Sequence, residues 1–188
     1  MGKQPLNENM VKTLRKLTAD NELHSLLLNL GVDTMLRASD LLLLKVGSVI
    51  SENGKVKDEV SVFQKKTKRK TIALPLSDHS KKVIKKYLNP LEQDRYIFIG
   101  QKKYTGRPIS TRQYQRIIKS WMTSLGVDDV NAFSSHSLRK TKSSIIFQKT
   151  KNIEACRRLL SHNSVSATSS YLGIEDSDAT DLARQYDI

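Results

Sequence analysis

Apolar residues recur at helical spacing over most of this 188-residue chain and alternate with polar residues only in its middle. Between residues 8 and 30 the spacing predicts one helix, with Gly31 as its C-terminal cap. Asp33 or Thr34 then offers an N-cap for a buried helix that contains the leucines at 41–44.

The middle of the chain has the period of β-strands. Three short runs, 46–50, 60–64 and 71–76, are β-branched or alternating, and an Asn-Gly pair at 53–54 is a turn signal between the first two. The simplest arrangement is a three-stranded antiparallel sheet. Its second hairpin then ends in the basic tip 65–70.

The rest of the chain returns to helical spacing. Helices are predicted at 78–88, 110–125, 136–150, 153–160 and 164–172, with a short strand at 96–99 and a loop at 106–108. Ser110 caps the second of these helices, and Trp121 on its inner face is expected in the core rather than stacked on a base. Together the elements predict a single α+β domain, mostly helical with a small three-stranded antiparallel sheet.

The chain is strongly basic, and its charge is clustered. The formal net charge is +13, and five of the six residues at 65–70 and four of the six at 81–86 are basic, with a third basic stretch at 139–158. A charge run is usually a solvated face, but an excess of this size with few local acids favours a polyanion partner. A membrane surface is the weaker option, because no segment is long and apolar enough to span and none resembles a signal peptide.

The number of cysteines excludes two further classes, disulfide-bonded proteins and proteins with a cysteine-bound metal. Cys156 is the single cysteine, so it forms no internal disulfide and there is no cysteine cluster for a metal. We therefore expect no metal site built on cysteine and an intracellular, reduced setting, which would be the cytoplasm. His24 and His79 have no catalytic neighbours in the sequence and are expected to be surface or satisfied residues.

The residues with chemical potential are concentrated in the last third. His136 and Arg139 stand in the sequence His-Ser-Leu-Arg, His162 follows 26 residues after His136, and Tyr171 lies nine residues further on. Arginine binds phosphate oxygens through a planar fork, and histidine exchanges protons near neutral pH. Tyrosine can act as a covalent nucleophile when its neighbours offset a pKa near 10. Each residue alone has an ordinary role as a helix cap, surface charge or core aromatic, but the set suits phosphoryl transfer.

This order of residues resembles the tyrosine recombinase (phage integrase) family. Upstream, Leu36-Arg37 followed three residues later by Asp40 resembles the family's first catalytic arginine, with Asp where Glu is the usual choice. In isolation, an arginine at such a helix junction is more often a surface bridge between helices. The family resemblance therefore carries the assignment of Arg37.

The basic hairpin supplies the remaining member of the set. A lysine followed by threonine in a β-hairpin is similar to the family's catalytic lysine, and Lys66 with Thr67 is the best match. Lys65 and Lys68 are neighbours that can be confused with it, because a register shift of one residue turns every side chain to the other face.

The resemblance implies a catalytic set and a mechanism without ATP or metal. The set is Arg37, Lys66, His136, Arg139, His162 and Tyr171. Tyr171 would attack a DNA phosphate and form a 3′-phosphotyrosyl link, while the arginines and His162 stabilise the charge of the transition state. His136 would accept the phenol proton and Lys66 would protonate the departing 5′-oxygen.

The same resemblance implies double-stranded DNA as the partner. Recombination would proceed through a Holliday junction in a homotetramer on DNA, and a monomer is compatible with the free protein. The basic residues expected to contact DNA are Lys65, Lys68, Arg69, Lys70, Arg112, Arg116 and Lys140.

The resemblance covers residues 20–173, which we interpret as a catalytic domain. Residues 1–19 would contain a flexible lead (1–7) and the start of the first helix. Residues 174–188 form an acidic tail that either docks on a neighbouring subunit or is a frayed terminus. The family's usual amino-terminal core-binding domain has no counterpart in this sequence, which is compatible with a fragment or with a compact member.

Two alternative functions stay open on the sequence. A type IB topoisomerase uses the same chemistry as a monomer on one duplex. A non-catalytic basic DNA-binding module would need only the positive charge.

Overall fold

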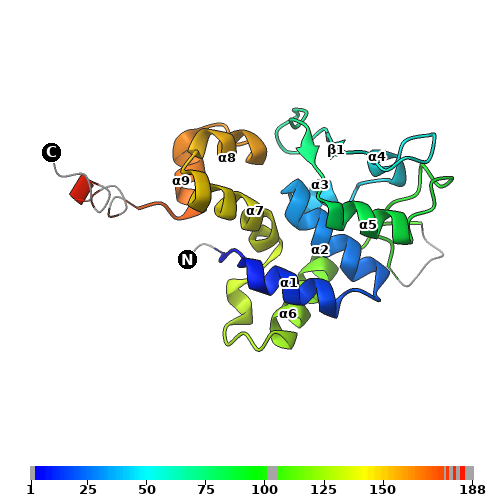
Figure 1. The fold of residues 1–188 in the computed structure, drawn as a ribbon, viewed down its shortest axis with the longest axis horizontal. Helices are drawn as coiled ribbons and strands as arrows, with labels where there is room; N and C mark the ends of the chain where they lie inside the picture. The colour runs from blue at the N-terminus through cyan, green and yellow to red at the C-terminus, as the bar shows by residue number, and fades with distance from the viewer. Residues whose placement is uncertain (1–2, 101–105, 176, 178–179, 181–182, 185–188) are drawn as a thin grey trace.

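The computed structural model describes residues 3–100, 106–175, 177, 180, 183 and 184 (Figure 1). The elements are α1 (Glu8–Leu17), α2 (Glu22–Thr34), α3 (Ala38–Leu41), α4 (Val46–Val49), β1 (Glu59–Val60), β2 (Leu74–Pro75), α5 (Asp78–Tyr87), α6 (Thr111–Ser124), a short 3₁₀ helix (Val130–Ala132), α7 (Ser135–Thr150), α8 (Ile153–Leu160) and α9 (Val165–Leu172). The α+β class is therefore confirmed, with helices dominating.

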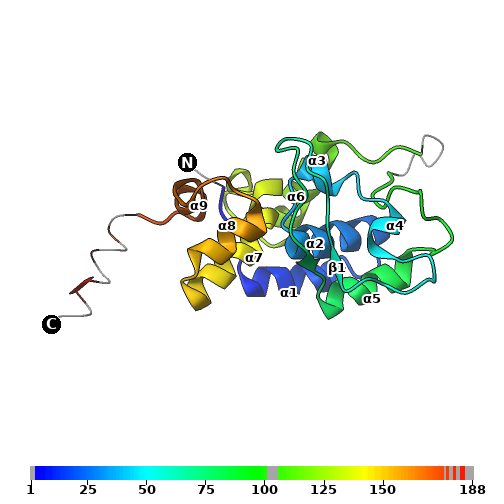
Figure 2. The same cartoon turned by 90° about the horizontal axis from the view of Figure 1, so that it is seen from above.

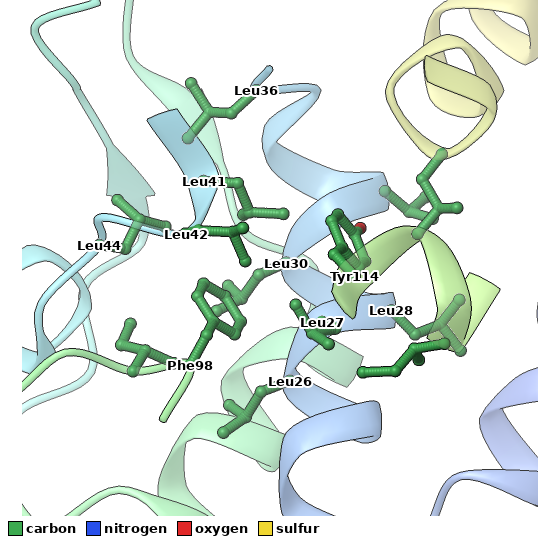
Figure 3. Close-up of a cluster of buried hydrophobic side chains, with 14 of the residues drawn as sticks. Leu26, Leu27, Leu28, Leu30, Leu36, Leu41, Leu42, Leu44, Phe98 and Tyr114 are labelled. Atoms are coloured by element: carbon green, nitrogen blue, oxygen red, sulfur yellow. The ribbon is translucent and has the colours of Figure 1, made fainter. Parts of the chain in front are cut away.

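Helix α2 is the centre of the core. Its residues from Ser25 to Thr34 are all buried, so the helix is covered on every side rather than on one face. It packs chiefly against α7 and α5. Figure 2 shows α1 and α5 on one side of α2, with α3 and α6 on the other. Leucines of α2 meet Leu41, Leu42, Phe98 and Tyr114 in the cluster of Figure 3.

The expectation of a flexible lead is wrong for the described residues before α1. Leu6 is only 2% exposed and belongs to the hydrophobic core. Its backbone N–H donates to the Thr141 hydroxyl at 3.0 Å, and the Gln4 N–H donates to the Ala132 carbonyl at 3.0 Å. These bonds fix the segment against α7 and the 3₁₀ helix, because buried backbone groups need partners.

The single helix expected at 8–30 is two helices. Helix α1 ends at Leu17, and Asn21 begins α2 by accepting a hydrogen bond from the His24 N–H at 2.9 Å. An asparagine side chain with this role favours a new helix start over continuation. Gly31 lies within α2 and is not a cap; Met35, with φ of 49°, ends the helix instead.

The expected caps at Asp33 and Thr34 are also wrong, since both residues lie inside α2. Asp33 is buried and joins two other elements. Its carboxylate accepts from the Ser77 N–H at 2.8 Å and the Ser80 hydroxyl at 2.5 Å at the start of α5, and it lies 3.4 Å from the Lys142 ammonium of α7. Of the four leucines at 41–44, only Leu41 lies in a helix, at the end of α3 (Ala38–Leu41). Leu41, Leu42 and Leu44 are buried.

The sheet has two strands among the described residues, not three. Strands β1 and β2 pair antiparallel with Val60 opposite Leu74. The expected first strand is the short helix α4, because Val46 and Val49, three positions apart, both face the core. The turn at 53–54 is present, with Gly54 at φ of 81°. Isolated bridges pair Tyr96 with Lys45 and Ile99 with Pro108, in place of a strand at 96–99.

The later helices match the expected ranges closely. As predicted, Ser110 caps α6 and Trp121 is 4% exposed in the core. Ser77 caps α5. The Trp121 indole N–H donates to His24 at 3.3 Å, so this histidine is satisfied. Helix α7 is capped by Ser134. No helix in the described part of the chain has both the length and the apolar character needed to cross a membrane.

Candidate active site

Arg139 is buried beneath the candidate site and is held by two backbone carbonyls. Its side chain, 2% exposed, donates to the Met35 carbonyl at the end of α2 and to the Leu160 carbonyl at the end of α8. Met35 and Ser161 both adopt left-handed backbone conformations. Burial lowers the pKa of Arg139 to about 10, so the guanidinium remains charged at neutral pH. A cation is therefore held in a fixed position where α2, α7 and α8 meet.

Arg37 lies between the end of α2 and the start of α3. A side chain of the basic hairpin holds its guanidinium in place. Its Nη1 donates to the Gln64 side-chain oxygen at 3.0 Å, and the Thr67 hydroxyl donates to the same oxygen at 2.8 Å. Gln64 is only 1% exposed. One buried amide therefore links the arginine to the hairpin tip.

Asp40 makes a second link between α3 and the hairpin. One oxygen of this buried carboxylate accepts from the Lys65 backbone N–H at 3.0 Å. The other oxygen has no hydrogen-bond partner among the described residues. Asp40 also contributes an attraction to Arg139. Its position after Arg37 therefore has a structural reason, because it anchors the hairpin.

Lys66 stands at the tip of that hairpin and is exposed. The tip is a tight turn in which the Lys68 N–H donates to the Gln64 carbonyl at 3.0 Å, and Lys68 has φ of 51°. Lys66 is close enough to lower the pKa of His136 through charge repulsion. The hairpin therefore carries Lys66 on the same side of the molecule as the histidine.

Tyr171, near the end of α9, contacts the first turn of α7. Its hydroxyl donates to the His136 carbonyl at 3.2 Å, and the Lys140 ammonium lies 5.9 Å from the centre of its ring. Burial raises the pKa of Tyr171, while the guanidiniums of Arg139 and Arg37 act in the opposite direction. The two cations thus favour the phenolate that a nucleophile requires.

His162 packs against the tyrosine from the loop after α8. The two rings meet edge to face with centres 5.0 Å apart. The His162 Nδ1 lies 3.2 Å from the hydroxyl of Thr168, a buried residue of α9. Burial lowers the pKa of His162 to about 4, and Arg139 and Arg37 add to the effect. The ring is therefore neutral at pH 7.

His136 is an exposed residue in the first turn of α7. Partial burial lowers its pKa, and the cations Arg139, Arg37 and Lys66 lower it further. A neutral imidazole can accept a proton, which is the state a general base needs. All six residues chosen from the sequence are therefore gathered around one place.

The seven expected DNA-binding residues are in different settings. Lys65, Lys68, Arg69 and Lys70 are exposed on the hairpin, and Lys140 is partly buried beside Tyr171. Arg112 and Arg116 are exposed on α6. Contact with DNA stays a prediction for all seven.

Sequence reasoning missed several supporting groups. Gln64 has a signal that could have found it, because it continues the inward alternation of Val60 and Val62 in the run before the basic tip. The two carbonyls that bind Arg139 have no side-chain signature. In the described residues no group of three or more His, Cys, Asp or Glu could hold a metal ion.

Comparisons with known proteins agree on one family. The sequence profile of the phage integrase family matches residues 4–177. The chain is 32% identical over 184 residues to the probable integrase/recombinase YoeC of Bacillus subtilis (strain 168), and the match covers 93% of this chain and 95% of YoeC. It is 33% identical over 134 residues to the tyrosine recombinase XerC of Neisseria gonorrhoeae (strain ATCC 700825 / FA 1090), covering 69% of this chain and 41% of XerC.

Solved structures share the fold. The crystal structure of XerA recombinase aligns with a TM-score of 0.75 at 20% identity, over 98% of this chain and 65% of that one. The XerH site-specific recombinase bound to a palindromic difH substrate aligns with a TM-score of 0.71 at 17% identity, over 97% of this chain and 53% of that one. The chain therefore spans about half to two thirds of these recombinases.

Proposed function

Because the chain belongs to the phage integrase family of tyrosine recombinases, we propose that it cleaves and rejoins DNA through a tyrosyl intermediate in site-specific recombination. The observation that carries the proposal is the meeting of Tyr171, His162, His136 and two arginines from separate elements. Double-stranded DNA is the proposed partner, supported by the charge of +13 and by the DNA complex of the similar XerH structure.

Charge development assigns a role to each group. A phosphodiester gains a second negative charge in its five-coordinate transition state, and fixed donors near the non-bridging oxygens stabilise it. Arg37 and Arg139 suit this role because both guanidiniums are held in place before DNA arrives. His162 adds a hydrogen bond.

The covalent step transfers two protons and exchanges one phosphate ester for another. The Tyr171 oxygen attacks phosphorus, His136 accepts the phenol proton, and a 3′-phosphotyrosyl bond forms as the bond to the 5′-oxygen breaks. The leaving oxygen takes a proton from Lys66. At pH 7 the pH is three units below the pKa of an ordinary tyrosine, so ionising the phenol costs about 4 kcal/mol. Burial raises the pKa of Tyr171 further, and the guanidiniums of Arg139 and Arg37 act against that rise.

The finer assignments extend the proposal. Residues 20–173 form the catalytic domain, and the protein assembles as a homotetramer on paired sites while remaining monomeric when free. It acts where the DNA is, in the cytoplasm. The positive hairpin tip at 65–70 follows the backbone of the bound duplex.

Covalent trapping tests the proposal. The protein is incubated with a duplex of a candidate site that is nicked near the scissile phosphate, so that the short 5′-hydroxyl fragment diffuses away, and adducts are resolved on a denaturing gel. We expect an adduct with the wild type and none with Tyr171→Phe, which removes one hydroxyl and no charge and so keeps nearly full DNA affinity. Tyr186→Phe is the matched control and retains the adduct. Adduct formation by Tyr171→Phe moves the nucleophile elsewhere, with Tyr186 the next candidate.

The two alternatives predict different products. A type IB topoisomerase forms the adduct and relaxes a single supercoiled plasmid, whereas a recombinase yields a Holliday junction from two duplexes. A DNA-binding module shifts DNA on a native gel and forms no adduct.

A further inference from the structure

A basic groove lies away from the candidate active site. It is a groove between α1 and α5 floored by α2, with a volume of about 210 Å³, and the polar residues lining it include Arg15, Ser25, Asn29, His79, Lys82 and Lys86. Ser25 and Asn29 precede Met35 by ten and six residues, which is about 15 and 9 Å along the helix axis. Figure 2 shows α1 and α5 on the side of α2 opposite to α3.

Arg15 is the fixed element of this groove. Its Nε donates to the Asn29 side-chain oxygen at 2.9 Å, and Asn29, 2% exposed, is itself held by a bond from its amide to the Ser25 carbonyl at 2.9 Å. No carboxylate in the described part of the chain lies within salt-bridge distance of this partly buried guanidinium. Asp33 attracts it from a longer range, but burial outweighs this attraction and lowers the pKa of Arg15. A partly desolvated cation with a neutral partner attracts an anion.

Helix α5 adds further positive charge to the same groove. His79, Lys82 and Lys86 follow one another at spacings of three and four residues, so they share one face of the helix. Lys86 is engaged with the Ala19 carbonyl at 2.9 Å and lies 3.7 Å from Asp20. Lys82 is exposed and has no carboxylate partner among the described residues. Arg15 and Lys82 are thus the cations left to meet a ligand.

We propose that this groove binds a phosphate group, held by the guanidinium of Arg15 and the ammonium of Lys82. The pocket is smaller than the 300–1,000 Å³ typical of sites for drug-sized ligands, so it suits the phosphate rather than a large attached group. The phosphate comes either from the backbone of DNA outside the cleaved site or from a free anion. The proposal does not depend on recombinase activity.

Titration with inorganic phosphate tests the site directly. Amide shifts of Ser25, Asn29 and the α5 face are followed at constant ionic strength in the wild type and in Lys82→Glu, an exposed position whose change leaves the fold intact. We expect saturable shifts at millimolar phosphate that weaken by about tenfold in the variant. Lys85→Glu is the matched control, because Lys85 is exposed on the same helix and does not line the groove.

DNA binding identifies the source of the phosphate. The slope of log affinity against log salt should fall by about 0.9 for each lost backbone contact. A fall in Lys82→Gln and Arg15→Gln, without one in Lys85→Gln and Lys16→Gln, assigns the groove to DNA even if free phosphate produces no shifts. An unchanged slope with saturable phosphate shifts assigns it to a free anion. Absence of both effects, or equal effects in the control variants, overturns the proposal.

Discussion

At the scale of single residues, the candidate site combines fixed cations with neutral histidines. Arg139 is bound to two carbonyls and Arg37 to one amide oxygen, so neither needs to reorganise when a phosphate arrives. The same cations, with burial, lower the pKa of both His136 and His162, which favours the neutral form of each ring in the free protein. Preorganised charge and an available base therefore have one physical origin.

Lys66 can be tested through the leaving group. If its ammonium protonates the 5′-oxygen, Lys66→Ala should cleave normal DNA about 100-fold or more slowly. It should recover on a 5′-bridging phosphorothiolate, because sulfur leaves without a proton. Adduct rates on the two substrates give the measurement. Lys65→Ala and Lys68→Ala are matched controls from the same exposed tip, and a rescue confined to one of them transfers the role to that lysine.

The lowered pKa of His162 should make the folded state of the free protein less stable in mild acid. Its pKa is about 4 in the folded chain against about 6.5 when unfolded, so between these values the unfolded state binds more protons. The contribution of His162 to the free energy of unfolding is therefore fully present above pH 6.5 and is lost as the pH falls towards 4. We expect His162→Gln to reduce the slope of unfolding free energy between pH 6.5 and 5 in urea melts. The control is His79→Gln, an exposed histidine, and an unchanged slope in His162→Gln contradicts the assignment.

At the scale of elements, substitution of Gly31 tests how closely α2 is packed. A Cβ at this position would lie 2.8 Å from the Tyr114 hydroxyl and 3.2 Å from Leu138. Overpacking costs about 1–3 kcal/mol, which exceeds the gain of about 1 kcal/mol in helix propensity from glycine to alanine. Gly31→Ala should therefore lower the free energy of unfolding. Tyr114→Phe in the same chain should restore most of it, because it removes the nearest atom, and failure to do so would place the strain elsewhere.

The link between hairpin and arginine makes a second prediction at this scale. Gln64→Ala removes the acceptor shared by Arg37 and Thr67, so both the cation and the tip of the hairpin lose their position. We expect adduct formation to slow by about tenfold to 100-fold with a smaller loss of DNA affinity. Thr67→Val is the control that cuts only the hairpin bond. An equal effect of both variants would show that the contact to Arg37 contributes nothing.

The sequence predicted helices better than it predicted the sheet and the helix junctions. Helices α5, α6 and α8 have clear apolar stripes and capping residues, and their ranges match. The break between α1 and α2 depends on the capping of Asn21 within an otherwise helical pattern, and α4 was too short for its period to be distinguished from a strand. Such choices are decided by tertiary packing.

The candidate site followed the same division. Its candidate side chains could be chosen from their order in the sequence, because that order resembles the tyrosine recombinase family. The groups that hold them could not, since Met35 and Leu160 contribute only backbone carbonyls. Gln64 lies between, because its alternation with buried positions marks it as inward-facing but does not name its partner.

At the scale of the whole molecule, charge is divided between a basic body and an acidic end. Residues 174–188 contain five acidic residues and one arginine, a net charge of −4 on a chain of +13. Most of this tail lies outside the described residues, so its docking stays a prediction from sequence. Its charge opposes contact with DNA. A positively charged surface of a neighbouring subunit is a suitable partner.

Deletion of residues 175–188 tests this role of the tail. If the tail docks on a neighbouring subunit, the truncated protein should lose cooperative assembly on paired sites, while Tyr171 still forms an adduct on a single site. Sedimentation on DNA measures the first quantity and denaturing gels the second. A matched variant with the acidic residues of the tail changed to their amides separates charge from apolar contact. Unchanged assembly would reduce the tail to a terminus without a partner. Loss of the adduct as well would mean that it supports α9 within its own chain, because α9 carries the tyrosine and directly precedes it.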